Sequence, residues 1–326
     1  MTDINTFNQC QYNTQPIHHL LHSTPYNRIS AHNNTHTFFS IGDWGEHNTD
    51  QYNVAQQMSL YSEIYKPLFI ISTGDNFYRD GVDSVDDPQW TTTYENIYTT
   101  QSLQCNWYSV LGNHDYHMEH YMNEINYSIE QCDHRWIMPA QYYYKQLQLY
   151  SDVILDIFFL DTWLLCDDTY SNGTIIDQSI KQQHVDWLVN QLELSHHNSL
   201  VHWRIVVGHY PLLSGGEHGN TNELIDSIQS ILYKYNIDFY LCGHDHTLQH
   251  LADQHNFNYY ISGNGAKRGT YHAIDESIYG IVDPGFMLHQ INTTHMYTQF
   301  IDLNGIVVYH TVQQSRQSQI TELLPD

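Results

Sequence analysis

Short apolar runs that each end in glycine and a metal-ligating side chain place the strongest constraint on the fold of this chain. Five such junctions follow one another: GDWG (42–45), GDNFY (74–78), GNHD (112–115), GHYP (208–211) and GHDH (243–246). Glycine permits a sharp backbone turn at each junction. In open α/β sheets, ligands bind at the carboxyl ends of strands, where loops from several strands meet. We therefore expect the five junctions to gather at one rim of the fold.

The apolar runs have the length and the β-branched or aromatic content of strands. The predicted strands are residues 38–41, 68–71, 107–111, 153–160, 203–207, 239–242 and 259–261. Helical spacing of apolar residues predicts helices at 51–65, 90–98 and 183–194. Strands that alternate with helices predict a layered α/β fold. We assign residues 1–36 to a polar N-terminal extension, 37–312 to one catalytic domain and 313–326 to a C-terminal tail.

Each junction taken alone has an ordinary explanation. Asp43 alone is more typical of a helix cap, and Asn113 with His114 is more typical of a turn. A lone His209 would be a core or loop histidine, and the pair in GHDH could arise by chance in a chain with 24 histidines. All five junctions in order, each after a predicted strand, favour a metal site instead.

The charge balance excludes one class of partner and suggests a dependence on pH. The chain has 36 acidic and 11 basic residues and a formal net charge of -25, which argues against a nucleic-acid surface. Histidine titrates at a pH of about 6.5, so protonation of the 24 histidines would offset almost all of this charge. We expect repulsion of an anionic ligand at neutral pH and little at mildly acid pH.

The N-terminal 30 residues have no basic segment followed by a continuous apolar one, and no stretch has transmembrane length. These features predict a soluble protein that does not act at a membrane, with a cytoplasmic location favoured over secretion and the compartment left open. A monomer is favoured, and the oligomeric state is also open. The five cysteines form no CxxC pair.

The chain resembles the metallophosphoesterases and, within them, the small animal-type purple acid phosphatases, also called tartrate-resistant acid phosphatases. Besides the five junctions, the resemblance includes LDT (160–162) and SGNG (262–265), and it extends from about residue 38 to about residue 310. Tyr78 distinguishes the purple acid phosphatases from general metallophosphoesterases and Ser/Thr protein phosphatases, which usually lack a tyrosine at this position. The Ser/Thr protein phosphatases also have GDxHG where this chain has GDWG. The resemblance implies a four-layer α/β/β/α sandwich of two mixed sheets flanked by helices.

The resemblance also implies two metal ions that share Asp75. One would be bound by Asp43, Tyr78 and His246, and the other by Asn113, His209 and His244. If Tyr78 is ionised, the first ion has three anionic ligands, Asp43, Asp75 and Tyr78, which suit Fe(III). The second ion has the shared carboxylate and three neutral ligands, which suit Fe(II), Zn(II) or Mn(II). Because a free tyrosine has a pKa of about 10, only a strongly polarising metal would hold it as phenolate.

The activity implied is hydrolysis of phosphomonoesters, on small molecules or phosphoproteins, by a metal-bound hydroxide at an Fe(III)–divalent metal centre. His114 would contact the phosphate or protonate the leaving oxygen. His218 is a second candidate acid, although a surface-loop histidine is an equal alternative, and Asp115 is expected to orient a neighbouring histidine. A disulfide found in relatives is expected to be absent, because Glu223 stands where the partner of Cys166 would be.

Two other functions stay open. A phosphodiesterase or nucleotide-directed hydrolase would use the same ligand set. A catalytically silent binding protein would keep the fold without the chemistry, but the intact set of ligand residues disfavours it.

Overall fold

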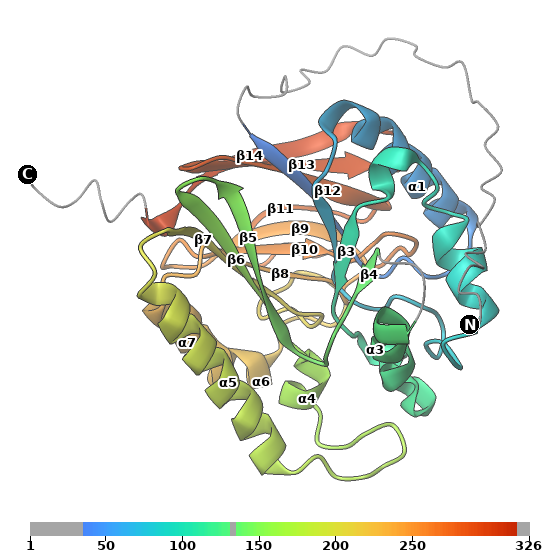
Figure 1. The fold of residues 1–326 in the computed structure, drawn as a ribbon, viewed down its shortest axis with the longest axis horizontal. Coiled ribbons are helices and arrows are strands. Elements are labelled where there is room, and N and C mark those ends of the chain that lie inside the picture. Colours follow the sequence, from blue (N-terminus) through green and yellow to red (C-terminus); the bar gives the residue numbers. More distant parts are fainter. Residues whose placement is uncertain (1–34, 131–134, 318–326) are drawn as a thin grey trace, which may run out of the picture.

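Two mixed sheets pack face to face with helices on the outside, which confirms the predicted fold class (Figure 1). The computed structural model describes residues 35–130 and 135–317. Helices α5 (Gln178–His196) and α7 (Ser230–Lys234) lie along one side of the sandwich in Figure 1, and α1 (Thr49–Tyr65) and α3 (Tyr121–Glu130) lie along the other. The other α-helices of the described residues are α2 (Asn113–Tyr116), α4 (Thr162–Cys166) and α6 (Asn222–Leu224).

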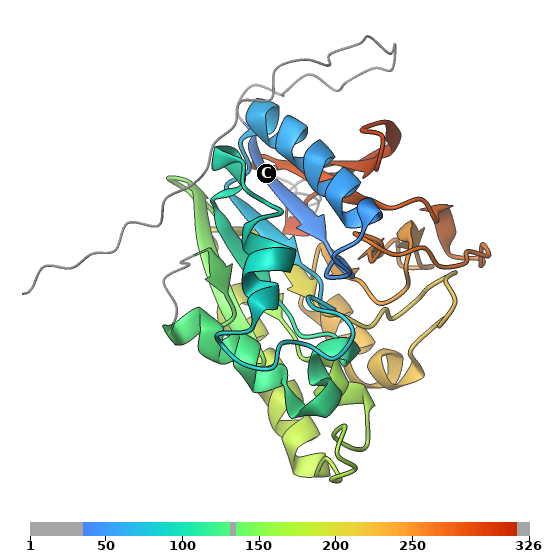
Figure 2. The same ribbon diagram turned by 90° about the vertical axis from the view of Figure 1, so that its right-hand side faces the viewer.

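The first sheet has seven strands in the order β14-β13-β12-β1-β2-β3-β4. Its parallel half contains β1 (His36–Ile41), β2 (Phe69–Ser72), β3 (Asn106–Ser109) and β4 (Trp136–Ile137). Its antiparallel half contains β12 (Gly285–Ile291), β13 (His295–Asp302) and β14 (Val307–Gln314). Helix α1 runs along this sheet, beside β1 (Figure 2).

The second sheet also has seven strands, in the order β11-β9-β10-β8-β7-β6-β5. Its four parallel strands are β6 (Val153–Phe159), β7 (Val201–Val207), β8 (Phe239–Cys242) and β10 (Asn258–Ser262). The antiparallel strands are β5 (Tyr143–Tyr150), β9 (Leu248–Ala252) and β11 (Ser277–Ile281).

Alternation along β7 divides its side chains between two cores. Trp203, Ile205 and Val207 belong to the core that joins the two sheets, whereas Val206 belongs to the core beneath α5, α6 and α7. This is the period of two that a strand buried on both faces produces. Strand β7 therefore packs against the other sheet on one face and against the helices on the other, and this packing positions its end.

The predicted strands correspond to β1, β2, β3, β6, β7, β8 and β10, and two predicted helices lie within α1 and α5. The segment predicted as a helix at 90–98 forms a π-helical turn, Trp90–Glu95, instead of an α-helix. The other strands, β4, β5, β9 and β11 to β14, were not predicted. Strand β4 has only two residues, and polar residues interrupt the apolar pattern of the others. His289 in β12, for example, is fully buried but bonds to Ser40 and Thr298 at 3.0 Å each.

The two termini of the domain differ slightly from the predicted boundaries. Strand β1 begins at His36, and β14 continues to Gln314, inside the predicted tail. The Gln313 side chain donates to the carbonyl of Asp238 (2.6 Å), and the Arg316 amide donates to the Asp238 carboxylate (2.7 Å). The domain division itself stays a prediction, since residues 1–34 and 318–326 lie outside the described residues.

Within residues 35–130 and 135–317, no helix has the length and apolar character needed to cross a bilayer.

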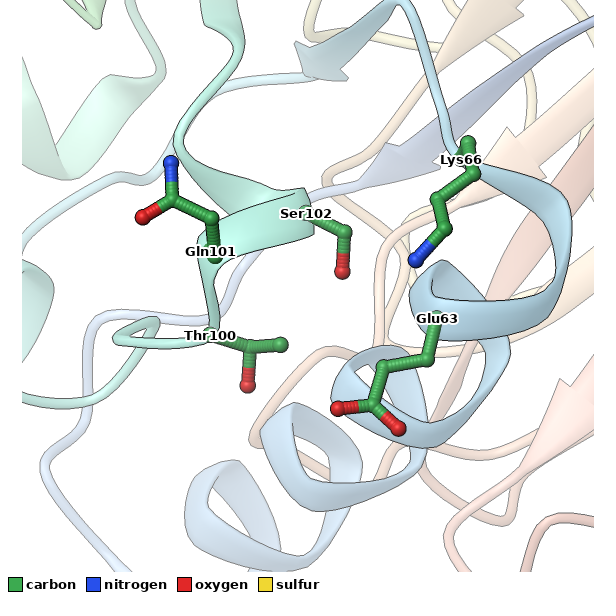
Figure 3. Close-up of a pocket in the computed structure, with 5 residues that line it drawn as sticks. All are labelled: Glu63, Lys66, Thr100, Gln101 and Ser102. Atoms are coloured by element: carbon green, nitrogen blue, oxygen red, sulfur yellow. The ribbon is translucent and has the colours of Figure 1, made fainter. Parts of the chain in front are cut away.

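A surface pocket is lined by Glu63, Lys66, Thr100, Gln101 and Ser102 (Figure 3). It lies where the chain enters β2 and β3, at the amino ends of these parallel strands. The pocket is therefore at the opposite edge from the five junctions.

Candidate metal centre

The five junctions meet at one rim, as the sequence predicts. Asp43, Asp75 and Asn113 follow β1, β2 and β3 of the first sheet. His209 and His244 follow β7 and β8 of the second sheet. The ligand-type side chains from the two sheets face one another, and Asp43, Asp75 and His209 offer donor atoms that all lie within 4.8 Å of one another. All three residues are buried, so the structure brings together a compact set of metal-ligating atoms.

Tyr78 lies between the two carboxylates of this group. Its hydroxyl is 3.1 Å from Asp43 Oδ1 and 2.9 Å from Asp75 Oδ2, and His246 Nε2 is 3.5 Å from the same hydroxyl. Burial, followed by the charges of Asp43 and Asp75, holds the pKa of Tyr78 well above its usual value of 10.0. A bound metal cation would reverse this local balance of charge, so the donor set fits a metal that binds a phenolate.

A second group of donors surrounds Asn113. Its Oδ1 is 3.1 Å from His209 Nε2 and 3.0 Å from His244 Nδ1. His209 Nδ1 is 2.8 Å from the carbonyl oxygen of Thr73, so Nδ1 donates to this oxygen and Nε2 is the ring nitrogen that faces Asn113. Burial holds the pKa of His244 well below 6.5, which keeps its ring neutral and able to bind a cation. These residues fit a divalent metal ion.

The first glycine of each junction is required by close approach, and only Gly74 among these five also has a positive φ, of 92°. A Cβ on Gly112 would lie 2.1 Å from Asp75 Oδ1, and a Cβ on Gly243 would lie 2.5 Å from Asp43 Oδ2. The turn itself is made by the ligand-type residues, since Asp43 and Asp75 have φ of 55° and 49°. Left-handed backbone in non-glycine residues costs free energy, and the surrounding structure must hold it in place.

Asp115 has a different partner from the one that the sequence suggested. Among the described residues, no histidine side chain is its hydrogen-bond partner. Its carboxylate accepts hydrogen bonds from the amides of Gly112 (2.7 Å), Asn76 (3.0 Å) and Phe77 (3.2 Å). Asp115 therefore connects the GNHD loop to the GDNFY loop, and burial raises its pKa to about 7.

The two candidate acids lie on different sides of the ligand group. The ring of His114 is 4.5 Å from the ring of Tyr78, and its Nδ1 is 2.6 Å from the carbonyl oxygen of Arg79. The ring of His218 is 4.0 Å from that of His244, and its side chain is 46% exposed. His218 is thus beside the ligand group, and not on a remote surface loop.

Asp245 is a residue of the site that the sequence reasoning missed. Its Oδ1 is 2.9 Å from His218 Nδ1 and accepts from the His218 amide at 2.8 Å. The hydrogen bond to Asp245 raises the pKa of His218. The sequence offered one indication of this role, because Asp245 stands between the two candidate metal ligands of GHDH, His244 and His246.

Among the described residues Cys166 is a free cysteine. Burial raises the pKa of its thiol, and the charges of Asp167 and Glu223 raise it further. Glu223 is therefore close to the thiol.

Comparisons with known proteins agree with this geometry. Residues 36–248 match the family model of the calcineurin-like phosphoesterases. Purple acid phosphatase 3 of Arabidopsis thaliana is 34% identical over 288 residues, which are 85% of this chain and 77% of that protein. Tartrate-resistant acid phosphatase type 5 of Homo sapiens is 32% identical over 297 residues, which are 84% of this chain and 89% of that protein.

Solved structures share the fold at lower identity. A structure of GAP50, described as the anchor in the inner membrane complex of Plasmodium, has a TM-score of 0.78 at 23% identity and covers 90% of this chain and 96% of its own. The structure of the purple acid phosphatase PPD1 of yellow lupin has a TM-score of 0.63 at 14% identity. The match covers 90% of this chain and 56% of the lupin chain. The family match and the identity to whole relatives together place this chain among the calcineurin-like phosphoesterases, as a member of the purple acid phosphatases.

Proposed function

We propose that this protein is an acid phosphatase that hydrolyses phosphomonoesters with Fe(III) and a divalent metal as cofactors. The observation that carries the proposal is the hydroxyl of Tyr78 between Asp43 and Asp75. Asp43, Asp75, Tyr78 and His246 would hold Fe(III). Asp75, Asn113, His209 and His244 would hold Fe(II), Zn(II) or Mn(II). When bound, two such ions polarise water and the phosphate oxygens.

The chain's own residues would position the ester and move protons. The His114 amide donates to Asp75 Oδ1 (2.9 Å), which holds the start of α2 against the ligand group. The ring of His114 lies beside Tyr78, where it would contact a phosphate oxygen. His218, held through Nδ1 by Asp245, has Nε2 left to give a proton to the leaving oxygen. A histidine acid of this kind requires mildly acid pH.

The first test is an absorption spectrum of the purified protein, with metal analysis of the same sample. A visible phenolate-to-Fe(III) band with about two metals per chain is expected for this dinuclear site, and Tyr78→Phe should lose the band. Two metals without the band would exclude ferric iron at Tyr78. The remaining interpretation would then be a phosphodiesterase or nucleotide-directed hydrolase, to be assayed on diesters at neutral pH.

A non-catalytic role is the second candidate, because the GAP50 structure, an anchor by its description, has the same fold. Asp75→Ala distinguishes the two roles. Since Asp75 belongs to both proposed ligand sets, the variant of an enzyme should lose both metals and nearly all phosphatase activity. A parent protein that binds metals but hydrolyses neither monoesters nor diesters would favour the non-catalytic role.

A further inference from the structure

The ammonium group of Lys267 lies on the ring of Tyr78. Lys267 Nζ is 3.7 Å from the centroid of that ring, within the range of a cation–π contact. The lysine belongs to the segment NGAKRG (264–269), which follows β10. This side chain is outside the proposed ligand sets and outside the pair of candidate acids.

Backbone hydrogen bonds fix this segment to the ligand-bearing loops on both sides of Lys267. The amides of Gly265 and Ala266 donate to the carbonyl oxygens of Gly42 (2.9 Å) and Asp43 (3.2 Å). The Gly269 amide donates to the carbonyl oxygen of His246 (2.9 Å). Lys267 is thus placed by the same loops that carry two of the proposed ligands of the Tyr78 metal.

The side chain of Lys267 is held in place as well. Its Nζ is 2.9 Å from Glu46 Oε1, and the two side chains are only 24% and 26% exposed. The next residue, Arg268, pairs instead with Asp50 (3.0 Å) and Asp283 (2.8 Å). The segment therefore places one cation on the Tyr78 ring and the other among acids away from it.

Basic side chains are few in this chain, which has 36 acidic and 11 basic residues. The ring that Lys267 contacts carries the hydroxyl that is 3.1 Å from Asp43 Oδ1 and 2.9 Å from Asp75 Oδ2. Lys267 therefore brings a positive charge to the ring that lies between the two carboxylates.

We propose that Lys267 is a positioning residue that acts through Tyr78 and sets how strongly this side chain donates electrons to a metal. A positive charge on the face of an aromatic ring lowers the energy of its π electrons. Lys267 thereby weakens donation from the ring and raises the energy of the charge-transfer band. The inference rests on the proposed function, since it requires Tyr78 to bind ferric iron.

The test compares the visible spectra of the parent and Lys267→Met at one pH, with metal analysis of both. In K267M the band should move to longer wavelength by on the order of 10 nm, the size expected from a cation–π interaction. Lys267→Arg keeps a cation and should leave the band in place. Arg268→Met removes a cation from the same segment without touching the ring, and should also leave it in place.

An unshifted band in K267M with full metal content overturns the inference and leaves the proposed function intact. A parent without the band overturns the ferric part of the proposed function and this inference with it. If K267M does not fold, Glu46→Gln replaces it. That variant removes the acidic partner of the ammonium, so its band should move to shorter wavelength, and an unshifted band overturns the inference.

Discussion

At the scale of single residues, the pair of His218 and Asp245 determines the pH dependence that we expect for catalysis. The hydrogen bond to Asp245 raises the pKa of His218, so the protonated ring persists to higher pH. Asp245→Asn should lower that pKa and move the alkaline limb of the kcat/KM profile to lower pH. The measurement is kcat/KM against pH with an aryl phosphate.

The control for this variant is Glu193→Gln, which changes another carboxylate beside a histidine, His197, at 3.0 Å but on the surface. Its profile should match that of the parent. Metal analysis of Asp245→Asn is also required, because Asp245 stands between His244 and His246. An unmoved alkaline limb with full metal content would show that His218 is not the acid.

His184 should weaken the fold in acid. It is fully buried on α5, and neither of its ring nitrogens has a hydrogen-bond partner among the described residues. Burial lowers its pKa from 6.5 to about 3. The neutral ring is therefore favoured in the folded state, and the stability that this provides is lost as the pH falls from 6.5 toward 3.

His184→Phe should keep the stacking on Tyr142, whose ring centroid is 4.0 Å away, and remove the titration. The free energy of unfolding in urea should then fall less steeply between a pH of about 6 and a pH of about 4, by up to about 1.4 kcal/mol per pH unit. His197→Phe, at an exposed site, is the control. Equal pH slopes for the parent and His184→Phe would contradict the prediction.

At the scale of elements, the loop between β3 and α2 supports the loop after β2. Gly112→Ala would place a Cβ 2.1 Å from Asp75 Oδ1 and 2.3 Å from the Asp75 amide. The carboxylate must move, so we expect loss of most bound metal and at least about a 100-fold loss of activity. Metal analysis and a phosphatase assay check this result.

Gly173→Ala is the control for this change. A Cβ there meets nothing within 4 Å, and its φ of 81° adds only backbone strain. Stability should fall by about 1 kcal/mol while metal content stays at the parent level. Full metal content in Gly112→Ala would mean that the close approach of the two loops is not needed for binding.

The elements also show which parts of the molecule a single sequence can predict. The junctions after β1, β2, β3, β7 and β8 were predicted because each is a local pattern of an apolar run, a glycine and a ligand-type residue. Strand β13 was not, because Thr298 and Gln299 are polar yet fully buried. The bonds of Asp115 to the GDNFY loop and the position of Lys267 depend on loops distant in sequence, so no local pattern encodes them.

At the scale of the whole molecule, the net charge of -25 should oppose the approach of an anionic ester at neutral pH. Salt screens such long-range repulsion, with a Debye length of about 10 Å at 0.1 M. Raising the salt concentration at pH 7 should therefore lower KM for a phosphomonoester. Near pH 5, where most exposed histidines are protonated, the same salt should have little effect. Equal salt effects at both pH values would contradict this account.

The ligand-type residues come from both sheets, with Asp43, Asp75, Tyr78 and Asn113 after strands of the first and His209, His244 and His246 after strands of the second. Neither sheet alone carries a complete set for the proposed pair of ions. A chain whose sheets have not yet docked can hold only part of the site. Metal content per chain is therefore a measure of the fraction of a preparation that has completed folding, independent of any assay of activity.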